Sequence, residues 1–547
     1  MAKVPIADRL EIRIVERGFY KGFNPTVSLI SKLIIMLLVL ALVANPTGAA
    51  DQLQELKAVT LSLFSAWYIN LLGLFVVVSA ALVVLPVSGR LKLGKPSDVP
   101  EYSTQSWLSM MICAGIGIGI LVFSVSEPVS HSISNPDILD GGTDGDVITS
   151  ALRFTFLHWG ISAWSCYAIV ALALGLNCHG NDQPMTMRSA LVPLFGARLE
   201  GWLGNGVDIL SILAIIAGIT TTIVLGLEQI CSGLSVLTGS TFFADFAGDP
   251  PLVALLTAML VALSIVTTSI LSGVDRGVKW ISNLGLLVAF GVLFVFLLTG
   301  PVGRLLAGLV EAGLAYLRHL PTEMFIVYGA SSDPPGPEQA RWQADWTIFY
   351  WAWWIAFAPF VGLFLAHISR GRTVREFILG AVIAPTLMCF LWFAVLGGSA
   401  LLLEADGIAE GSILGAPHAM RIYQTLDLAL DPIAATIMKG VIVFLFLILI
   451  VASTSAAIIA IKSIGASGAV VAETPLHSMI WAVVIAGIAG AVMAVGGVSS
   501  VRDTMIVGAV PFSGIMALML LSILRIVLKA RASSAAVDGS AGPDFRT

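Results

Sequence analysis

The chain has 547 residues, of which 57% are hydrophobic and only 12% are charged, and its formal net charge is −5. Soluble domains are nearer to about 45–50% apolar and about 25% charged, so this composition excludes a soluble enzyme and a disordered chain. The slight acidic excess also argues against nucleic acid as a partner. A polytopic membrane protein remains, and because HExxH and GxSxG motifs are absent, we expect no enzymatic activity.

Twelve apolar stretches are long enough to cross a bilayer, which takes about 20 residues. In chain order they are 27–45, 66–87, 106–126, 153–176, 207–231, 252–273, 282–299, 346–368, 377–403, 432–461, 478–497 and 505–528. Between the seventh and eighth, residues 303–320 place leucines at helical spacing among charged residues, which predicts an amphipathic helix at the membrane interface. Residues 1–26 form a basic N-terminal segment, and 529–547 form a short tail that we expect to be flexible.

Lysine and arginine concentrate in the N-terminal segment, in the loops after the second and eighth spans, and in the C-terminal tail. With twelve spans, all four of these segments fall on one side of the membrane. Acidic residues such as Asp137 and Glu404 lie in loops on the other side. Because basic loops stay cytoplasmic, the pattern predicts a plasma-membrane (inner-membrane) protein with both termini in the cytoplasm.

The third span contains three glycines in alternation, Gly115, Gly117 and Gly119. Each weakens a helix by about 1 kcal/mol. A dinucleotide-binding loop is unsuitable here because that motif follows a strand. Two interpretations remain: close packing of helices through small residues, or a broken helix whose free N–H groups bind a ligand's anionic end. The pair Glu127–Pro128 is then expected to end the span near its outer side.

Aromatic residues share one side of two spans. At about 100° per residue, Trp159, Trp164 and Tyr167 occupy one side of the fourth span, and Tyr350, Trp353, Trp354 and Phe357 occupy one side of the eighth. A membrane-interface belt or ordinary core packing could explain such residues. They could also form an aromatic cage for a quaternary ammonium, which needs no acidic side chain. The sequence fits this, because it has no Asp or Glu near the middle of the third, fourth or eighth span.

Hydroxyl groups cluster in two further spans, at Thr220–Thr222 in the fifth and Ser453–Ser455 in the tenth. Hydroxyl and backbone oxygens suit a hard cation such as Na⁺. Serine and threonine in membrane helices also bond to their own backbone or to a neighbouring helix, so both interpretations stay open.

Several motifs together make a resemblance visible. The tryptophan-rich run DWTIFYWAWWIAFAPFVGLFLAHISRGRTVREF at 345–377 closely resembles the signature of the betaine/choline/carnitine transporter family. The same holds for GIGIG and EP within 115–128, HWGISAWSCYA at 158–168, MRSALVPLFG at 187–196 and DRGVKWISNLG at 275–285. The resemblance runs from about residue 12 to 528.

The resemblance implies an all-α integral membrane protein with a LeuT-type fold. Two N-terminal helices (27–87) would precede two inverted five-helix repeats (106–299 and 346–528), which the interfacial helix 303–320 would join. A homotrimer is also implied. The expected substrates are compact zwitterions or cations with a quaternary ammonium or sulfonium head.

The resemblance also implies the binding residues. Substrate would contact Trp159, Trp164, Tyr167, Trp351, Trp353, Trp354 and Phe357, together with Gly115, Ile116, Gly117 and Gly119. The family's eighth span usually continues with tryptophan where this chain has Phe357, whose ring offers a weaker π face. This difference hints at a shifted substrate preference. The absence of an acidic residue in the glycine stretch favours glycine betaine or dimethylsulfoniopropionate over choline or carnitine.

The resemblance to the family is weaker at the positions expected to bind Na⁺. The resemblance implies Na⁺ ligands at Ala114, Ile116, Thr220, Thr221 and Ser453. Sodium-coupled members tend to carry Thr where this chain has Ala452, and Asp where it has Ser455. We expect Na⁺-coupled import and no other cofactor. Ion-independent exchange within the same family is the main alternative, and a channel or membrane sensor is a remote one from another class.

Overall fold

The structure is a computed structural model that describes residues 9–142, 146–245, 248–272, 279–329, 335–468 and 474–540. The described part is helical, and its β-type pairing is limited to two isolated bridges, Val15 with Lys21 and Lys92 with Thr373. Ten helices are long and apolar enough to cross a membrane, or eleven if the bent pair α3–α4 is one span. The prediction of an all-α membrane protein is therefore confirmed.

The helices of the first half are α1 (Pro25–Ala44), α2 (Pro46–Val84), α3 (Thr104–Gly115), α4 (Ile118–His131), α5 (Pro136–Leu139), α6 (Val147–Trp159), α7 (Ile161–Cys178), α8 (Val192–Phe195), α9 (Trp202–Thr238), α10 (Leu252–Leu271) and α11 (Lys279–Thr299). Short 3₁₀ turns are η1 (Pro86–Gly89), η2 (Met187–Leu191) and η3 (Gly196–Glu200). Part of the motif at 275–285, residues 275–278, lies outside the described residues.

The second half contains α12 (Val302–Glu323), α13 (Gly336–Gln343), α14 (Phe349–Ile368), α15 (Val374–Ile378), α16 (Ala384–Ala405), α17 (Ser412–Gly415), α18 (Arg421–Ala429), α19 (Pro432–Gly465) and α20 (Pro475–Ser540). Single π-turns, η5 (Ala344–Ile348) and η6 (Leu379–Ile383), lead into α14 and α16, and η7 (His418–Met420) precedes α18.

Local sequence signals fix several helix ends. Asn24 caps α1, and Asn45 caps α2 with a proline at the first helical position. Asp431 caps α19 in the same way, and Thr373 with Glu376 forms a capping box at α15. These side chains accept hydrogen bonds from the first free N–H groups of each helix, so they explain why the chain turns helical there.

Two helices differ from the predicted spans. Helix α2 begins at Pro46, twenty residues before the predicted start at 66, because its charged first turns are too polar to register as a bilayer span. Helix α20 joins the last two predicted spans across a bend at Gly496 and Gly497, where Gly497 has φ +61°. It also continues to Ser540, so residues 529–540 of the predicted flexible tail are helical, and 541–547 lie outside the described residues.

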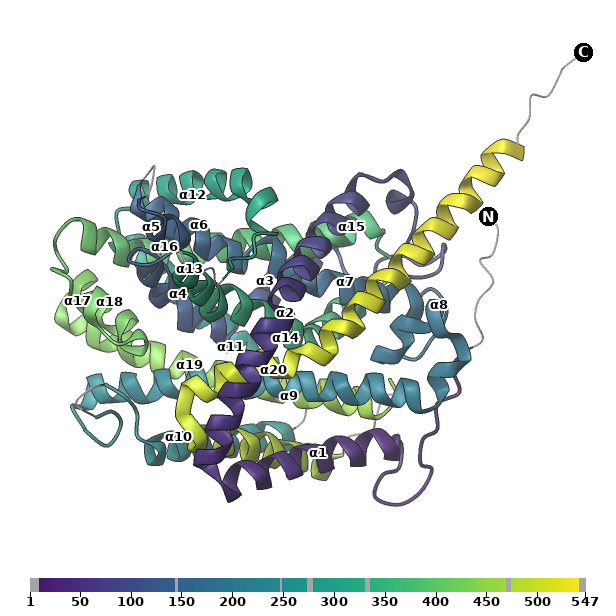
Figure 1. Cartoon of the computed structure of the whole chain (residues 1–547), viewed down its shortest axis with the longest axis horizontal. Helices are drawn as coiled ribbons and strands as arrows, with labels where there is room; N and C mark the ends of the chain where they lie inside the picture. Colours follow the sequence, from purple (N-terminus) through teal and green to yellow (C-terminus); the bar gives the residue numbers. More distant parts are fainter. Residues whose placement is uncertain are drawn as a thin grey trace, which may run out of the picture.

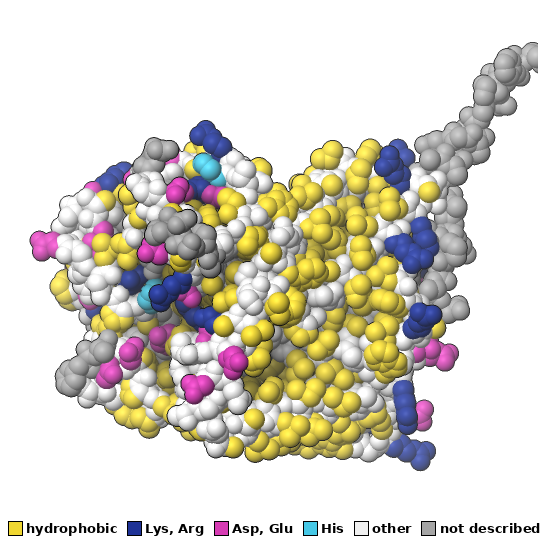
Figure 2. Space-filling model, viewed as in Figure 1, with side chains coloured by type: hydrophobic (Ala, Val, Ile, Leu, Met, Phe, Trp, Pro, Cys, Tyr) yellow, Lys and Arg dark blue, Asp and Glu magenta, His cyan; other side chains and the backbone are white. Residues whose placement is uncertain are grey.

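The surface shows a broad apolar band with charged residues gathered at its two ends (Figure 2). Helix α1 begins and α20 ends at the same end of the molecule, which also carries α15 (Figure 1). Helices α12, α17 and α18 lie at the other end. The apolar band is what a protein embedded in lipid needs, since no water covers its flanks.

Helix α12 is the predicted amphipathic segment, and it lies against α6 and α16. Leu305, Ala312 and Tyr316 are buried on one side, whereas Leu314 and Leu317 are exposed. The Tyr316 hydroxyl accepts a hydrogen bond from the backbone N–H of Ile161, at the junction of α6 and α7. The helix is thus anchored to the core and still exposes apolar side chains, as an interfacial helix does.

Candidate functional site

A central cavity of about 450 Å³ lies between the broken helix α3–α4 and helices α6, α7, α9, α11, α14 and α19. Rings line one part of it, and the backbone of the glycine stretch lines another. Its polar side chains are Thr222, Ser282, Asn283, Tyr167 and Ser453, and none of the lining residues in the described part of the chain is charged. Such a cavity suits a small ligand held by ring faces and backbone dipoles rather than by an ion pair.

Four of the rings that line the cavity form a continuous set, which we call the aromatic box: Trp159, Trp164, Tyr167 and Trp354. Trp159 meets Trp354 edge-to-face with 4.9 Å between ring centroids, and Tyr167 meets Trp354 at 6.1 Å. Trp164 meets Tyr167 at 5.5 Å. Trp353 stacks on Trp354 from the same helix at 5.7 Å. Their faces and edges surround a space in which a cation would meet several ring quadrupoles.

Hydrogen bonds fix two of the box tryptophans. The Trp354 Nε1–H donates to the backbone carbonyl of His158 (3.0 Å), which ties α14 to the end of α6. The Trp159 Nε1–H donates to the carboxylate of Glu127 (2.7 Å) on α4. Both indoles therefore have their polar edge satisfied within the protein, and their faces remain available to the cavity.

The glycine stretch is a break between two helices, which confirms the broken-helix interpretation. Helix α3 ends at Gly115, Ile116 and Gly117 have extended backbone, and α4 starts at Ile118 with a bend of 60°. A side chain at Gly119 would lie 2.9 Å from the Trp353 ring and 3.0 Å from the Trp159 ring. The break leaves backbone groups facing the cavity, and glycine at 119 lets Trp159 and Trp353 approach the backbone.

The structure brings together all but one of the predicted substrate residues. Trp159, Trp164, Tyr167, Trp353, Trp354, Phe357, Gly115, Ile116, Gly117 and Gly119 line the cavity. Trp351 does not: it is 1% exposed, and its ring lies edge-on to His158, 6.0 Å away. Phe360 and Phe364, which follow Phe357 by one and two turns of α14, also line the cavity and were not predicted.

Only some of the predicted sodium ligands line the cavity. Ala114, Ile116 and Ser453 line the cavity, but Thr220 and Thr221 do not. Their neighbour Thr222 lines it instead, and its hydroxyl donates to the carbonyl of Gly218. The Thr221 hydroxyl donates to Ala217 in the same way. Within the described residues the Thr220 hydroxyl is buried without a partner.

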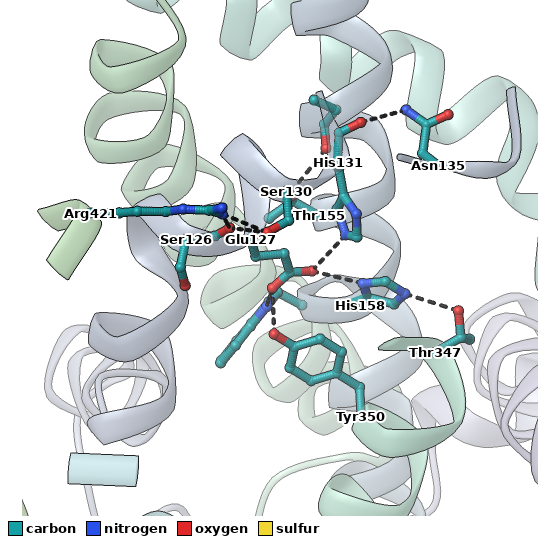
Figure 3. A network of polar contacts seen from close by, with 12 residues as sticks. Ser126, Glu127, Ser130, His131, Asn135, Thr155, His158, Thr347, Tyr350 and Arg421 are labelled. Carbon is teal, nitrogen blue, oxygen red and sulfur yellow. Dashed lines mark hydrogen bonds and ion pairs between the residues drawn. The ribbon is translucent and has the colours of Figure 1, made fainter. Parts of the chain in front are cut away.

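Glu127 is where the structure corrects the sequence interpretation. Helix α4 continues past Pro128 to His131, so Glu127 does not end a span but lies fully buried inside the helix bundle. Its Oε1 accepts from His158 Nδ1 (2.7 Å) and His131 Nε2 (3.3 Å), and its Oε2 accepts from Trp159 and from the Tyr350 hydroxyl. Figure 3 shows the carboxylate between the two imidazoles and Tyr350. Buried ionisable groups within a membrane span are a signal of function that this sequence carried.

A second cavity of about 570 Å³ lies at the other end of α14, lined by Asp345, Trp346, Phe349, Arg502 and seven further residues. The second cavity lies at the N-terminal end of α14, whereas the first extends towards the C-terminal end of α14, as far as the half-exposed Phe364. An aromatic layer separates the two: Phe123, Phe349, Tyr350 and Trp353 contact one another, with 5.3–6.3 Å between ring centroids. Trp353 lines the first cavity and Phe349 lines the second, so this layer lies where the two cavities approach each other.

A small substitution should test whether Gly119 positions the box. If the cavity holds the expected substrate, Gly119→Ala should weaken its binding roughly fivefold, since the new methyl group would meet Trp353 and Trp159 and overpacking costs about 1–3 kcal/mol. Gly291→Ala on α11, where nothing lies within 4 Å of the added carbon, is the matched control and should bind as wild type. Equal affinities of both variants, measured by labelled-substrate binding, would contradict this role.

Comparison with known proteins agrees with the family resemblance seen in the sequence. The sequence model of the betaine/carnitine/choline family of transporters matches residues 26–532. The chain is 32% identical over 517 residues to the glycine betaine/proline/choline/ectoine transporter VP1456 of Vibrio parahaemolyticus, covering 93% of this chain and 88% of that one. It is 31% identical to the glycine betaine transporter OpuD of Bacillus subtilis (89% and 91% covered) and 33% identical to the osmo-independent choline transporter BetT1 of Acinetobacter baylyi (92% and 93% covered).

Proposed function

The chain belongs to the betaine/carnitine/choline family of transporters, and from that premise we propose that it imports a small methylated osmolyte of the glycine betaine or dimethylsulfoniopropionate type. The observation that carries this proposal is an uncharged cavity lined by the four rings of the aromatic box. Quaternary ammonium and sulfonium heads bind ring faces without needing a buried carboxylate in contact. Choline and carnitine are less favoured substrates.

The proposed pose follows from the two parts of the cavity wall. The methylated head lies among Trp159, Trp164, Tyr167 and Trp354, and the anionic end faces the glycine stretch 115–119. Free N–H groups at the break in α3–α4 suit a carboxylate, because the start of α4 also carries the positive end of its dipole. Phe357, at the edge of the cavity, adjusts its width where the family usually carries tryptophan.

Alternating access is the proposed mechanism. The bundle of α3–α4, α6–α7, α14 and α16, whose members pack on one another, would rock against the remaining helices. If both termini are cytoplasmic, as the basic loops predict, the central cavity opens towards the cytoplasm and the aromatic layer closes the outer side. This layer argues against a channel, which needs a continuous polar pore. A homotrimer is part of the proposal by family resemblance alone.

Sodium coupling is the proposed energy source. Ala114 and Ile116 at the helix break line the same cavity as Ser453 on α19. The two backbone carbonyls and the hydroxyl would supply the ligands. Thr222 joins them from α9 in place of Thr220 and Thr221. Hydroxyl and carbonyl oxygens are ligands that a hard cation accepts. The main alternative, ion-independent exchange, is favoured by Ala452, which lacks the hydroxyl of the family's usual Thr, and by Ser455, which lacks the carboxylate of the usual Asp.

Uptake into proteoliposomes separates the two mechanisms. With labelled glycine betaine outside, symport predicts accumulation only under an inward Na⁺ gradient; exchange predicts uptake in K⁺ alone when unlabelled substrate is preloaded. Dimethylsulfoniopropionate, choline and carnitine are added as competitors to rank the substrates. Failure of all four to be transported or to compete would overturn the proposed substrate class.

The sodium residues allow a sharper test. If Na⁺ drives uptake, we expect Ser453→Ala to raise the Na⁺ concentration needed for half-maximal uptake about tenfold, the effect of losing about 1.4 kcal/mol of ligand interaction. Ser264→Ala is the control, because that exposed hydroxyl only donates to the carbonyl of Leu260. An unchanged Na⁺ dependence in Ser453→Ala would remove Ser453 from the site.

A further inference from the structure

Arg502 on α20 lines the second cavity. Its Nε is buried and has no hydrogen-bond partner among the described residues. Its guanidinium carbon lies over three aromatic rings, at 4.9 Å from the Phe349 centroid, 5.8 Å from that of Phe123 and 5.9 Å from that of Trp346. A guanidinium carries five N–H donors and keeps its charge at every physiological pH. Ring faces attract this charge, but they do not accept its N–H groups as a carboxylate does.

Other cations hold the two carboxylates of this cavity. Asp503 Oδ1 lies 2.8 Å from the Lys57 ammonium, which joins α20 to α2. Asp345 lies 4.0 Å from the same ammonium and 3.8 Å from the guanidinium of Arg341. Within the described part of the chain, none of the ion pairs at this cavity includes Arg502. Three cations therefore share two carboxylates, and Arg502 is the cation that neither carboxylate contacts.

The other polar side chains of the cavity wall are neutral. Gln54 and Ser499 line it, and so does His418 on η7. Burial is the main cause that lowers the pKa of His418 to about 4, so this imidazole carries no charge at neutral pH. The charge of Glu228 on α9 reaches Arg502, but this carboxylate does not line the cavity. The wall therefore presents one guanidinium together with groups that can donate hydrogen bonds to an anion.

We propose that Arg502 forms a binding site for a small monovalent anion in the second cavity, either a free halide or the carboxylate of a solute. A guanidinium binds a carboxylate through two parallel hydrogen bonds, and its N–H groups can equally surround a halide. One bound anion would make the negative charges at the cavity equal in number to the three cations. The site is separate from the aromatic box, because no described residue lines both cavities.

The cavity can exchange such an anion with solvent, because the side chain of Asp345 on its wall is 45% exposed. The carboxylate form of the site rests on the proposed function. If both termini are cytoplasmic, a zwitterion that enters from outside meets Arg502 before the aromatic layer. Arg502 then attracts a solute that carries a carboxylate and repels choline, which carries only a positive charge. The halide form of the site does not depend on the transported substrate.

Trp346 provides a direct measurement of binding, because its ring lines the cavity next to Arg502 and iodide quenches tryptophan fluorescence on contact. Purified full-length protein is titrated with iodide at constant ionic strength, with a bulky sulfonate as the balancing anion. Binding at a site gives quenching that saturates, whereas random collisions with exposed tryptophans give quenching that does not. Trp346→Phe keeps a ring at this position and should lose the saturable part.

Substitutions at Arg502 test whether its charge holds the anion. Arg502→Gln should raise the iodide concentration at half-saturation about tenfold or more, because the charged N–H donors are lost. Arg502→Lys keeps the charge without the planar fork and should lie between wild type and Arg502→Gln. Arg318→Gln, which removes an exposed arginine on α12 outside the cavity wall, should match wild type. Unsaturable quenching in wild type, or an unchanged half-saturation in Arg502→Gln, would overturn the inference.

Competition against bound iodide identifies the anion. Chloride, acetate, glycine betaine and choline are added in turn to Trp354→Leu protein, in which the central site is weakened. Displacement by acetate and glycine betaine but not by choline assigns the site to a carboxylate, and displacement by chloride without glycine betaine assigns it to a free anion. Equal displacement by choline would overturn the inference.

Two further results keep the tests separate. If Arg502→Gln does not fold, the wild-type titration and Arg502→Lys still decide whether the site exists. Absence of glycine betaine binding and uptake in the wild-type protein would overturn the proposed function, whereas saturable iodide quenching that depends on Arg502 would still establish the anion site.

Discussion

Replacing Trp354 with leucine should weaken glycine betaine binding by up to roughly 30-fold, because a desolvated cation–π contact contributes about 0.5–2 kcal/mol. Trp354 is the residue that joins the box: its ring contacts those of Trp159, Tyr167 and Trp353. Leucine retains apolar volume but offers no ring quadrupole. Equilibrium binding of labelled glycine betaine and uptake into proteoliposomes both measure the effect.

Two further variants test whether the loss of affinity comes from the loss of the Trp354 ring face. Trp354→Phe keeps a π face and should lose less affinity than Trp354→Leu. Trp202→Leu removes an 84% exposed tryptophan at the start of α9 and should bind as wild type. If folded Trp354→Leu protein binds with wild-type affinity, the box does not hold the substrate. The same outcome would also leave the tryptophan-rich signature without a role in binding.

Replacing Asp208 with asparagine should destabilise the protein by about 3–5 kcal/mol, because it leaves the Arg188 guanidinium buried without its counter-charge. Both side chains are 0% exposed, and Arg188 Nε lies 2.7 Å from Asp208 Oδ2. The same guanidinium donates to the Leu199 carbonyl and to the Asn205 side chain, which in turn accepts from Asn24 at the start of α1. One ion pair thus joins α1, η2 and α9.

The matched control replaces both partners. Arg188→Met combined with Asp208→Leu removes the buried charges together, so it should recover most of the stability that Asp208→Asn loses. Thermal unfolding of detergent-purified protein measures this difference. Neither position lines the central cavity, so the fraction of Asp208→Asn that folds should keep its glycine betaine affinity. A double variant as unstable as the single one would show that the pair acts through packing and not through charge.

The amino-acid sequence determined the membrane architecture. Apolar stretches, caps and basic loops are local features, and each follows from the chain's own chemistry without any long-range contact. The same holds for faces of helices: at about 100° per residue, Trp353, Trp354 and Phe357 lie close together around α14. The three line the central cavity.

The same geometry explains two differences at the site. On a regular helix Trp351 lies about 60° from Trp354 and about 120° from Phe357, so it points away from the face that lines the cavity. Its ring packs against His158. Thr222 lies about 200° from Thr220, so only one of the two can face the cavity from α9. The motif suggested the residue types, and the rotation of each helix, set by its packing neighbours, selected which of them reach the cavity.

Glu127 is the case that only the tertiary structure could decide. Its sequence neighbour Pro128 is a signal for the end of a helix, yet α4 continues to His131. Arg421 on α18 donates to the Ser126 carbonyl within this helix. The four donors to its carboxylate come from α4, α6 and α14, and the most distant of them lies 223 residues from Glu127 in the sequence. A buried charge is stable only when such donors converge, and convergence is a property of the packed helices that no stretch of sequence contains.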